Sequence, residues 1–305
     1  MSVAFVFPGQ GSQSVGMMNA FADIAVVKDT FAEASSVLGM DVWQLVSEGP
    51  QESLNATVNT QPVMLTADVA VYRAWLAQGG AVPAMVAGHS LGEYAALVAA
   101  EVLSFADALR LVKLRAEAMQ SAVPEGVGAM AAILGLDDAV LQAACDEAAQ
   151  GEVVAPVNYN SAGQTVIAGH KAAVERACEL AKAKGAKRAL LLPVSVPSHC
   201  ELMKPAAEKL GAALSGLAIN APKMPVLHNV DVATHDAPAD ISTALVEQLY
   251  RPVRWVETVQ KLAENGATVI VECGPGKILL GLNKRIAAEA RHVAFTDPAQ
   301  FAELA

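Results

Sequence analysis

The stretch MVAGHSLGEYAALVAA, residues 85–100, decides the fold of this chain. The apolar run Met85–Ala87 precedes the turn Gly88-His89-Ser90-Leu91-Gly92, and an Ala-rich run of high helix propensity follows it. Glycines two positions before and two positions after a serine permit a tight turn between a strand and a helix. We therefore expect a strand at Met85–Ala87, a helix at Leu91–Ala100, and a Ser90 hydroxyl that is exposed at the turn between them.

The same kind of strand followed by a glycine-rich turn occurs near both ends of the chain. The strand-like run Val3–Phe7 leads into Pro8-Gly9-Gln10-Gly11-Ser12-Gln13. The strand-like run Thr268–Glu272 leads into Gly274-Pro275-Gly276-Lys277 and then into a helical pattern at Ile278–Ile286. Repeated strand, turn and helix predict an α/β fold with a largely parallel sheet.

The middle of the chain has a different order of elements. Pro124-Glu125-Gly126 provides a hinge, and residues 126–194 then follow the β-α-β-β-α-β order of ferredoxin-like domains. The expected elements are Met130–Leu134, Asp137–Ala149, Val153–Tyr159, Thr165–Gly169, Lys171–Lys184 and Arg188–Pro193. We therefore expect a small ferredoxin-like domain at 126–194, inserted into a larger catalytic domain formed by residues 1–125 and 195–305.

The charge of the chain limits its partners. With 21 basic and 31 acidic side chains the net charge is -10, which disfavours binding to the phosphate backbone of nucleic acids. An acidic protein partner would need a local basic patch, although basic segments are more often ordinary solvated surface. The two candidate segments are Lys182, Lys184, Lys187 and Arg188, and Lys277, Lys284 and Arg285.

Composition indicates a globular protein of the cytoplasm. Hydrophobic residues make up 53% of the 305 residues and charged residues 17%, which is not the composition of a disordered chain. The apolar stretches are interrupted well before the roughly 20 residues needed to span a membrane, and Met1–Pro8 lacks the pattern of a signal peptide. The four cysteines are scattered without a Cys-x-x-Cys pair, so neither a metal site nor a disulfide framework is predicted.

Ser90 is the predicted nucleophile, and a serine hydroxyl needs a base. His89 is adjacent in sequence, but neighbouring side chains diverge at such a turn. His199, in Val196-Pro197-Ser198-His199, lies where the chain returns from the predicted insert, and clefts form at domain junctions. We therefore favour His199 as the base. His170 belongs to the predicted insert, at a strand–helix junction. Three further histidines lie in loop-like or terminal segments without other reactive neighbours: His228, His235 and His292.

The acidic member of a hydrolase triad is missing from the expected place. Hydrolases with this turn carry an Asp or Glu between the serine and the histidine in sequence. Asp107, Asp137 and Asp138 instead belong to the starts of predicted helices. A backbone carbonyl would then have to orient the imidazole of His199.

Arg115 departs from the pattern of its predicted helix, Phe105–Met119. Most charged residues of this segment lie on one side, whereas Arg115 falls between Ala108 and Leu111 among apolar neighbours. Such an arginine can be a snorkelling or structural residue. Its planar guanidinium is also suited to a carboxylate or phosphate ligand.

The two terminal glycine-rich loops fail as nucleotide motifs. Ser14 occupies the third glycine position of a dinucleotide fingerprint, and Ile278 follows Lys277 where a phosphate loop has Ser or Thr. Because Gln10 lies between two glycines, its loop can instead present a backbone N–H to an oxyanion.

Together these motifs resemble malonyl-CoA:acyl carrier protein transacylases, the enzymes that load malonyl groups in bacterial fatty-acid synthesis. The resemblance extends over essentially the whole chain. It rests on Pro8–Gln13, Gly88-His89-Ser90-Leu91-Gly92-Glu93-Tyr94, Arg115, Asn158-Tyr159-Asn160-Ser161, Val196–His199, Gln248-Leu249-Tyr250 and Gly274–Lys277.

The resemblance implies a role for each matching residue. Ser90 matches the nucleophile, His199 its general base and acid, and Arg115 the arginine that binds the malonyl carboxylate. The main-chain N–H groups of Gln10 and Leu91 match the oxyanion hole. Two further matches are Gln248, whose backbone carbonyl orients the histidine, and Asn160, near the acyl pocket. The implied fold is a hydrolase-like α/β core with a ferredoxin-like insert.

The expected reaction is malonyl transfer from malonyl-CoA to the phosphopantetheine thiol of acyl carrier protein, by a monomer without metal or other cofactor. Val196-Pro197-Ser198 resembles the stand-alone fatty-acid form and favours malonyl over methylmalonyl. A loading enzyme for a polyketide or malonate-decarboxylase system, a serine hydrolase, and a non-catalytic binding subunit stay open as alternatives.

Overall fold

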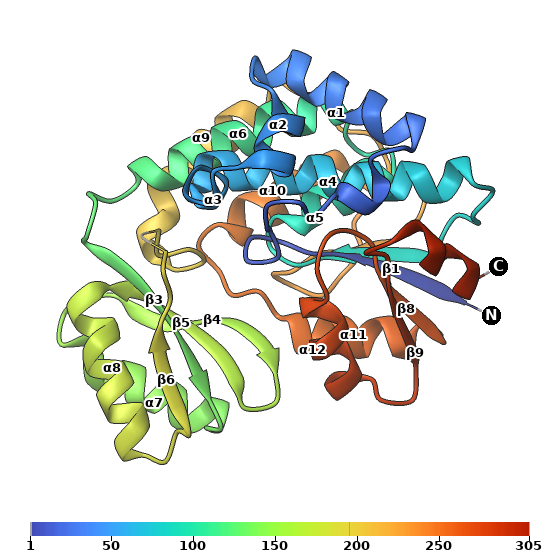
Figure 1. The fold of residues 1–305 in the computed structure, drawn as a ribbon. Helices are drawn as coiled ribbons and strands as arrows, with labels where there is room; N and C mark the ends of the chain where they lie inside the picture. The colour runs from blue at the N-terminus through green and yellow to red at the C-terminus, as the bar shows by residue number, and fades with distance from the viewer. Residues whose placement is uncertain (1, 195, 305) are drawn as a thin grey trace.

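A computed structural model describes residues 2–194 and 196–304, and its centre is a sheet of five parallel strands. The strand order is β7-β2-β1-β8-β9, so the first strand of the chain lies in the middle (Figure 1). All four neighbouring pairs are parallel. The strands are β1 (Val3–Phe7), β2 (Met85–Gly88), β7 (Val226–Leu227), β8 (Val269–Glu272) and β9 (Arg291–Ala294).

Helices cover both faces of this sheet, because its strands are apolar on both sides. On β1, Phe5 and Phe7 belong to the large core beneath the helices of one face, whereas Ala4 and Val6 belong to the core beneath α11 and α12. The helices are α1 (Ala25–Leu38), α2 (Val42–Glu48), α3 (Gln51–Asn55), α4 (Thr57–Ala77), α5 (Gly92–Ala99), α6 (Phe105–Ser121), α9 (Lys204–Leu214), α10 (Pro238–Gln248), α11 (Trp255–Glu264) and α12 (Ile278–Ile286). Short 3-10 turns occur at Asn19–Phe21, Glu201–Met203 and Pro298–Glu303.

A second, antiparallel sheet lies beside the first and has its own core. Its strand order, β4-β5-β3-β6, is that of ferredoxin-like domains, with two helices packed on one face (Figure 1). Its elements are β3 (Gly128–Leu134), α7 (Asp138–Ala149), β4 (Val154–Ser161), β5 (Gln164–His170), α8 (Lys171–Ala183) and β6 (Arg188–Leu191). The predicted fold class is confirmed, while the predicted domain boundaries at 125/126 and 194/195 stay predictions.

Backbone hydrogen bonds join the small sheet to the parallel core. The N–H of Tyr159 on β4 donates to the carbonyl of Val253, and the N–H of Val253 donates to the carbonyl of Val157, at 3.0 and 2.8 Å. Val253 lies in the loop before α11, so a strand of the small sheet is tied to a loop of the core. On the surface, Arg285 of α12 also donates to the Gln164 side chain at 2.8 Å.

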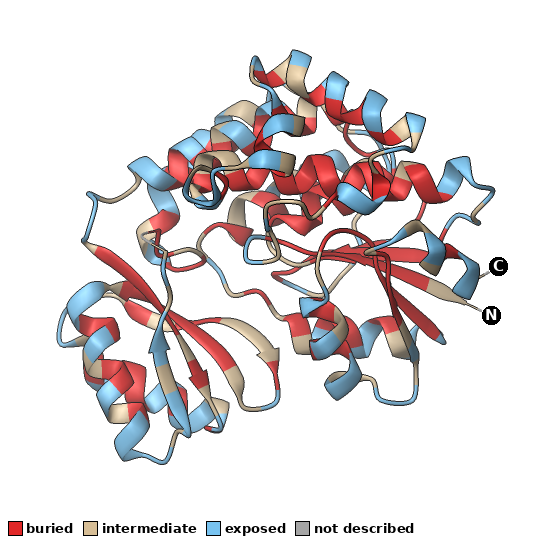
Figure 2. Ribbon diagram, in the orientation of Figure 1, coloured by how far each residue is buried: buried red, intermediate tan, exposed pale blue. Residues whose placement is uncertain are grey.

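Burial follows these three cores, with exposed residues on the outer faces of the helices (Figure 2). Helix α4 is an exception because nearly every side of it is buried, including Pro62 inside the helix. Within the described residues, no helix has the length and apolarity required to cross a membrane. The four cysteines carry free, buried thiols.

Candidate active site

The predicted nucleophile turn joins β2 to α5. Ser90 adopts a φ of 51°, in the left-handed region that non-glycine residues rarely enter. Two contacts of Asn229 hold this conformation: its Oδ1 accepts the N–H of Ser90 at 2.8 Å, and its Nδ2 donates to the Gly88 carbonyl at 2.7 Å. The turn is therefore fixed by a residue far away in the sequence, and the strain is concentrated at the reactive serine.

Gly92 is required by the close approach of α5 to β1. A Cβ at this position would lie 2.1 Å from the carbonyl oxygen of Phe7. We expect Gly92→Ala to lower the free energy of unfolding by about 1–3 kcal/mol or more, because neither backbone can give way. Urea denaturation measures this loss. The matched control is Gly281→Ala in α12, where a Cβ meets nothing within 4 Å; equal losses for both variants would contradict the steric explanation.

Ser90 and His199 lie together as the sequence predicts. Ser90 Oγ is 2.8 Å from His199 Nε2, and His199 Nδ1 is 2.6 Å from the carbonyl oxygen of Gln248. A carbonyl only accepts, so Nδ1 carries the proton, and Nε2 of the neutral ring accepts from the serine hydroxyl. Within the described residues no carboxylate hydrogen-bonds to His199. The backbone carbonyl occupies the place of the third triad member.

Burial keeps the imidazole of His199 neutral, so that its Nε2 is unprotonated and can accept a proton. Burial and the nearby Arg115 lower the pKa of His199 to about 3, against an opposing effect of the Gln248 hydrogen bond. Since the unfolded chain takes up this proton near the ordinary pKa of 6.5, the histidine makes the fold less stable as the pH falls from 6.5 towards 3.

We therefore expect the rate of Ser90 acylation to stay nearly constant from about pH 8 down to about pH 5, the range in which an ordinary histidine titrates. Stopped-flow or quenched-flow measurement of adduct formation across this range tests it. A decline with an apparent pKa near the ordinary value of a histidine would contradict the geometry, because it would mean that water reaches the ring.

Arg115 is almost completely buried, as the helical pattern predicts. Its side chain is 1% exposed, and its Nη1 and Nη2 donate to the amide oxygens of Gln61 and Gln248 at 2.7 and 3.0 Å. Nη2 also lies 3.4 Å from Ser90 Oγ. No carboxylate within residues 2–194 and 196–304 forms an ion pair with it. A buried guanidinium held by neutral oxygens beside a nucleophile is suited to an anionic part of a substrate.

A cavity of ≈ 470 Å³ opens above these residues. Ser90, His199 and Arg115 line it, together with Gln10 and Leu91. Leu91 immediately precedes α5, where main-chain N–H groups lack partners within the helix, so the position suits an oxyanion hole. Met130 and Asn158 of the small sheet also line the cavity. The candidate site therefore lies between the two sheets.

Asn160 is not among the residues that line the cavity. Its Oδ1 is 2.8 Å from Nε2 of His89, and it is His89 that reaches the cavity surface. Asn158, two residues earlier on β4, lines the cavity. The structure thus gives Asn160 a contact with the nucleophile turn, and its proposed place in the acyl pocket stays a prediction.

The prediction that His228 has no reactive neighbours is wrong. His228 is fully buried, and its Nδ1 lies 2.7 Å from Oε1 of Glu93, a carboxylate that is also fully buried. Glu93 also accepts the N–H of Asn229 and the side-chain amide of Gln248. The sequence analysis named Glu93 only within the motif that carries the resemblance, gave it no role, and missed Gln61 and Asn229. The one available signal was the charge of Glu93 within an otherwise apolar helix.

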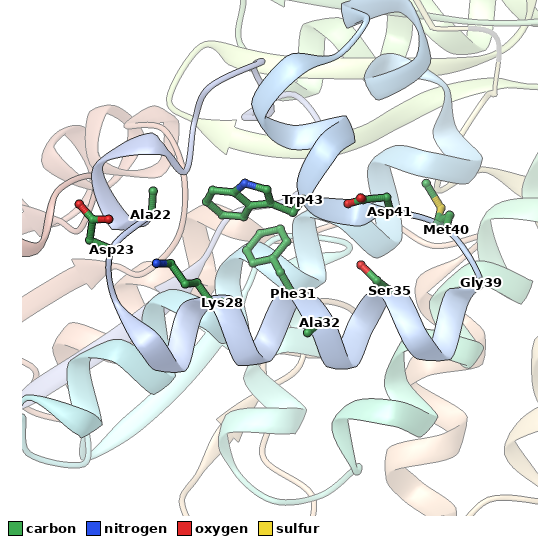
Figure 3. A pocket seen from close by; sticks show the side chains of 10 residues that line it. All are labelled: Ala22, Asp23, Lys28, Phe31, Ala32, Ser35, Gly39, Met40, Asp41 and Trp43. Carbon is green, nitrogen blue, oxygen red and sulfur yellow. The ribbon is translucent and has the colours of Figure 1, made fainter.

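A second hollow, of ≈ 940 Å³, lies between α1 and α2 (Figure 3). Phe31 and Trp43 form its apolar floor, and Asp23, Lys28 and Asp41 lie around it. It contains no histidine beside its one serine, Ser35. Nucleophilic chemistry is therefore assigned to the cavity at Ser90.

Comparison with known proteins agrees with this geometry. Residues 4–294 match the family model of the acyl transferase domain. The malonyl CoA-acyl carrier protein transacylase of Escherichia coli (strain K12) is 59% identical over 300 residues, which cover 98% of this chain and 97% of that protein. The Bacillus subtilis (strain 168) transacylase is 46% identical, with coverage of 97% and 94%. The crystal structure of the acyl-carrier-protein S-malonyltransferase from Burkholderia pseudomallei 1710b has a TM-score of 0.98 at 59% identity, over 99% of both chains. The chain belongs to the malonyl-CoA:acyl carrier protein transacylase family.

Proposed function

We propose that this chain transfers a malonyl group from malonyl-CoA to the phosphopantetheine thiol of acyl carrier protein in fatty-acid synthesis. One observation carries the proposal: the Ser90 hydroxyl lies 2.8 Å from a neutral histidine and 3.4 Å from a buried guanidinium. A malonyl thioester has a carbonyl for the nucleophile and, two carbons away, a carboxylate for the arginine. The cavity that Ser90 and Arg115 both line can hold these two groups at once.

In the first half-reaction the malonyl carboxylate binds Arg115 and the thioester carbonyl lies over Ser90. His199 Nε2 takes the hydroxyl proton as Oγ forms a bond to the carbonyl carbon. The N–H groups of Gln10 and Leu91 stabilise the oxyanion, at about 2.7–4 kcal/mol for such a donor. The carbon–sulfur bond then breaks, and the imidazolium of His199 returns the proton to the leaving sulfur of CoA.

In the second half-reaction the thiol of the carrier protein attacks malonyl-Ser90. His199 accepts the thiol proton as the sulfur forms a bond to the acyl carbon. The bond from that carbon to Ser90 Oγ then breaks, and His199 returns the proton to Oγ, so the enzyme is regenerated. The kinetics are ping-pong, with one covalent intermediate. Gln248 keeps the imidazole oriented throughout, because its carbonyl accepts the Nδ1 proton at 2.6 Å.

The names of the relatives support this proposal. A malonyl-transacylase that is 54% identical to this chain, with a TM-score of 0.98, has been solved in complex with a type II polyketide acyl carrier protein. The four free thiols fit the reducing cytoplasm, which we propose as the location.

The experiment that tests the proposal compares transfer with hydrolysis. The protein is mixed with malonyl-CoA in the presence and absence of acyl carrier protein, and both malonyl-carrier and free malonate are measured. We expect transfer to dominate when the carrier is present. Release of malonate at the same rate with or without carrier would instead identify a thioesterase, and no malonyl adduct at all would indicate a binding subunit.

A further inference from the structure

Two opposite charges are buried next to the nucleophile without forming an ion pair. Arg115 on α6 is 1% exposed and Glu93 on α5 is 0% exposed. Their attraction at short range would be strong, because the protein interior screens charges poorly. In the part of the chain that the structure describes, neither forms an ion pair with the other.

The side-chain amide of Gln248 lies between the two charges. Its Oε1 accepts from Nη2 of Arg115 at 3.0 Å, and its Nε2 donates to Oε2 of Glu93 at 2.9 Å. The amide dipole is thus aligned with both charges. The same Nε2 also donates to the backbone carbonyl of Ser90 at 2.9 Å. Gln248 itself is fully buried at the end of α10.

Glu93 also has two other hydrogen-bond partners, His228 and Asn229. His228 Nδ1 lies 2.7 Å from its Oε1, and the N–H of Asn229 donates to its Oε2 at 3.1 Å. With Gln248, the carboxylate has three partners and is stabilised without the guanidinium. The hydrogen-bond acceptors of Arg115 are the neutral amide oxygens of Gln61 and Gln248, and its Nε has no hydrogen-bond partner within the described residues. Its positive charge can therefore act on an incoming carboxylate.

We propose that the side chain of Gln248 is a specificity-determining spacer, which keeps Arg115 from pairing with Glu93 and so keeps it available for an acyl carboxylate. This rests on the proposed function, in which malonyl is the acyl group. Gln248 then has two separable parts: its main-chain carbonyl orients His199, and its side chain sets the preference for carboxylate-bearing acyl groups. Without the amide, Arg115 turns to Glu93 and a buried ion pair forms.

The separation allows a direct experiment, since Gln248→Met removes the amide and leaves the main-chain carbonyl. The measured quantity is the ratio of kcat/KM for Ser90 acylation by malonyl-CoA to that by acetyl-CoA. We expect this ratio to fall by about tenfold or more, mainly through KM for malonyl-CoA, as for loss of a charge-assisted contact. Arg115→Ala sets the lower limit of the ratio. If Gln248→Met is unstable, Gln248→Ala tests the same ratio.

The double variant Gln248→Met/Glu93→Gln decides between a spacer and a merely structural residue. Glu93→Gln removes the charge that competes for Arg115, so the ratio should recover towards that of the wild type. A structural role predicts that the double variant is worse than either single one. The matched control is Glu272→Gln, another buried glutamate, which binds the N–H groups of Leu279 and Leu280 away from this network.

An unchanged ratio in Gln248→Met, or no recovery in the double variant, would overturn the inference. Wild-type protein is assayed in parallel for malonyl-Ser90 and for transfer to the carrier protein. If the wild-type protein forms no malonyl-Ser90 or transfers no malonyl group to the carrier, the proposed function itself is wrong. If it does both while the variants deviate from the expected ratios, only the spacer role of Gln248 is wrong.

Discussion

Replacing Ser90 with alanine should eliminate the malonyl adduct and lower the transfer rate by roughly 10⁴- to 10⁶-fold, as for other serine nucleophiles. We expect no replacement by another side chain, because within the described residues Ser90 Oγ is the hydroxyl hydrogen-bonded to His199 Nε2, at 2.8 Å. Intact-protein mass spectrometry after mixing with malonyl-CoA measures the adduct directly. An adduct of the wild-type mass shift in Ser90→Ala would refute the assignment of the nucleophile.

Ser90→Gly serves as the control for folding. The φ of 51° at this position is strained for any residue with a Cβ, so the glycine variant should be more stable than the alanine variant in thermal or urea denaturation. Both should lack the adduct. If Ser90→Gly unfolds at a higher temperature than Ser90→Ala and still forms no adduct, its loss of activity cannot be attributed to a damaged fold.

His199→Ala should have the second largest effect, a loss of acylation rate of roughly 10⁴-fold or more. The imidazole removes the Ser90 proton and later protonates the leaving sulfur, and both steps fail without it. Rapid-quench measurement of malonyl-Ser90 formation gives the rate, and a malonyl-CoA binding assay separates this effect from substrate affinity. Binding should persist because Arg115 keeps its contacts with Gln61 and Gln248.

Another histidine acting as the base would give a different result. His89 is the nearest alternative in sequence, but its Nε2 is engaged with Asn160 at 2.8 Å. Retention of more than about a tenth of the wild-type acylation rate in His199→Ala would show that the observed dyad is not the reacting pair.

Local sequence signals predicted the elements on which the chemistry is built. The glycine spacing around Ser90 predicted β2, α5 and the turn, and the observed bounds differ from the predicted ones by about a residue. The apolar pattern of Phe105–Met119 identified Arg115 as a misplaced charge, and its burial confirms that reading. Local sequence patterns predict a residue's structure and burial correctly when its environment is determined by residues close to it in sequence.

Other parts of the fold and of the site have no signal in the local sequence that would predict them. Helix α4 is buried on almost every side, so it lacks the polar face that makes a helix recognisable, and β7 has only two residues. Glu93, His228 and Asn229 meet across more than 130 positions in sequence. Contacts of that kind follow from the packing of α5 against the loop after β7. The orienting role of Gln248 was expected from family resemblance alone.

The backbone bonds between β4 and Val253 also limit how the protein can be redesigned. They tie the small sheet to the parallel core by paired peptide groups, and these bonds oppose a separation of the two walls of the cavity. Widening the range of acyl groups therefore requires smaller side chains at wall positions such as Met119, Met130 and Val196.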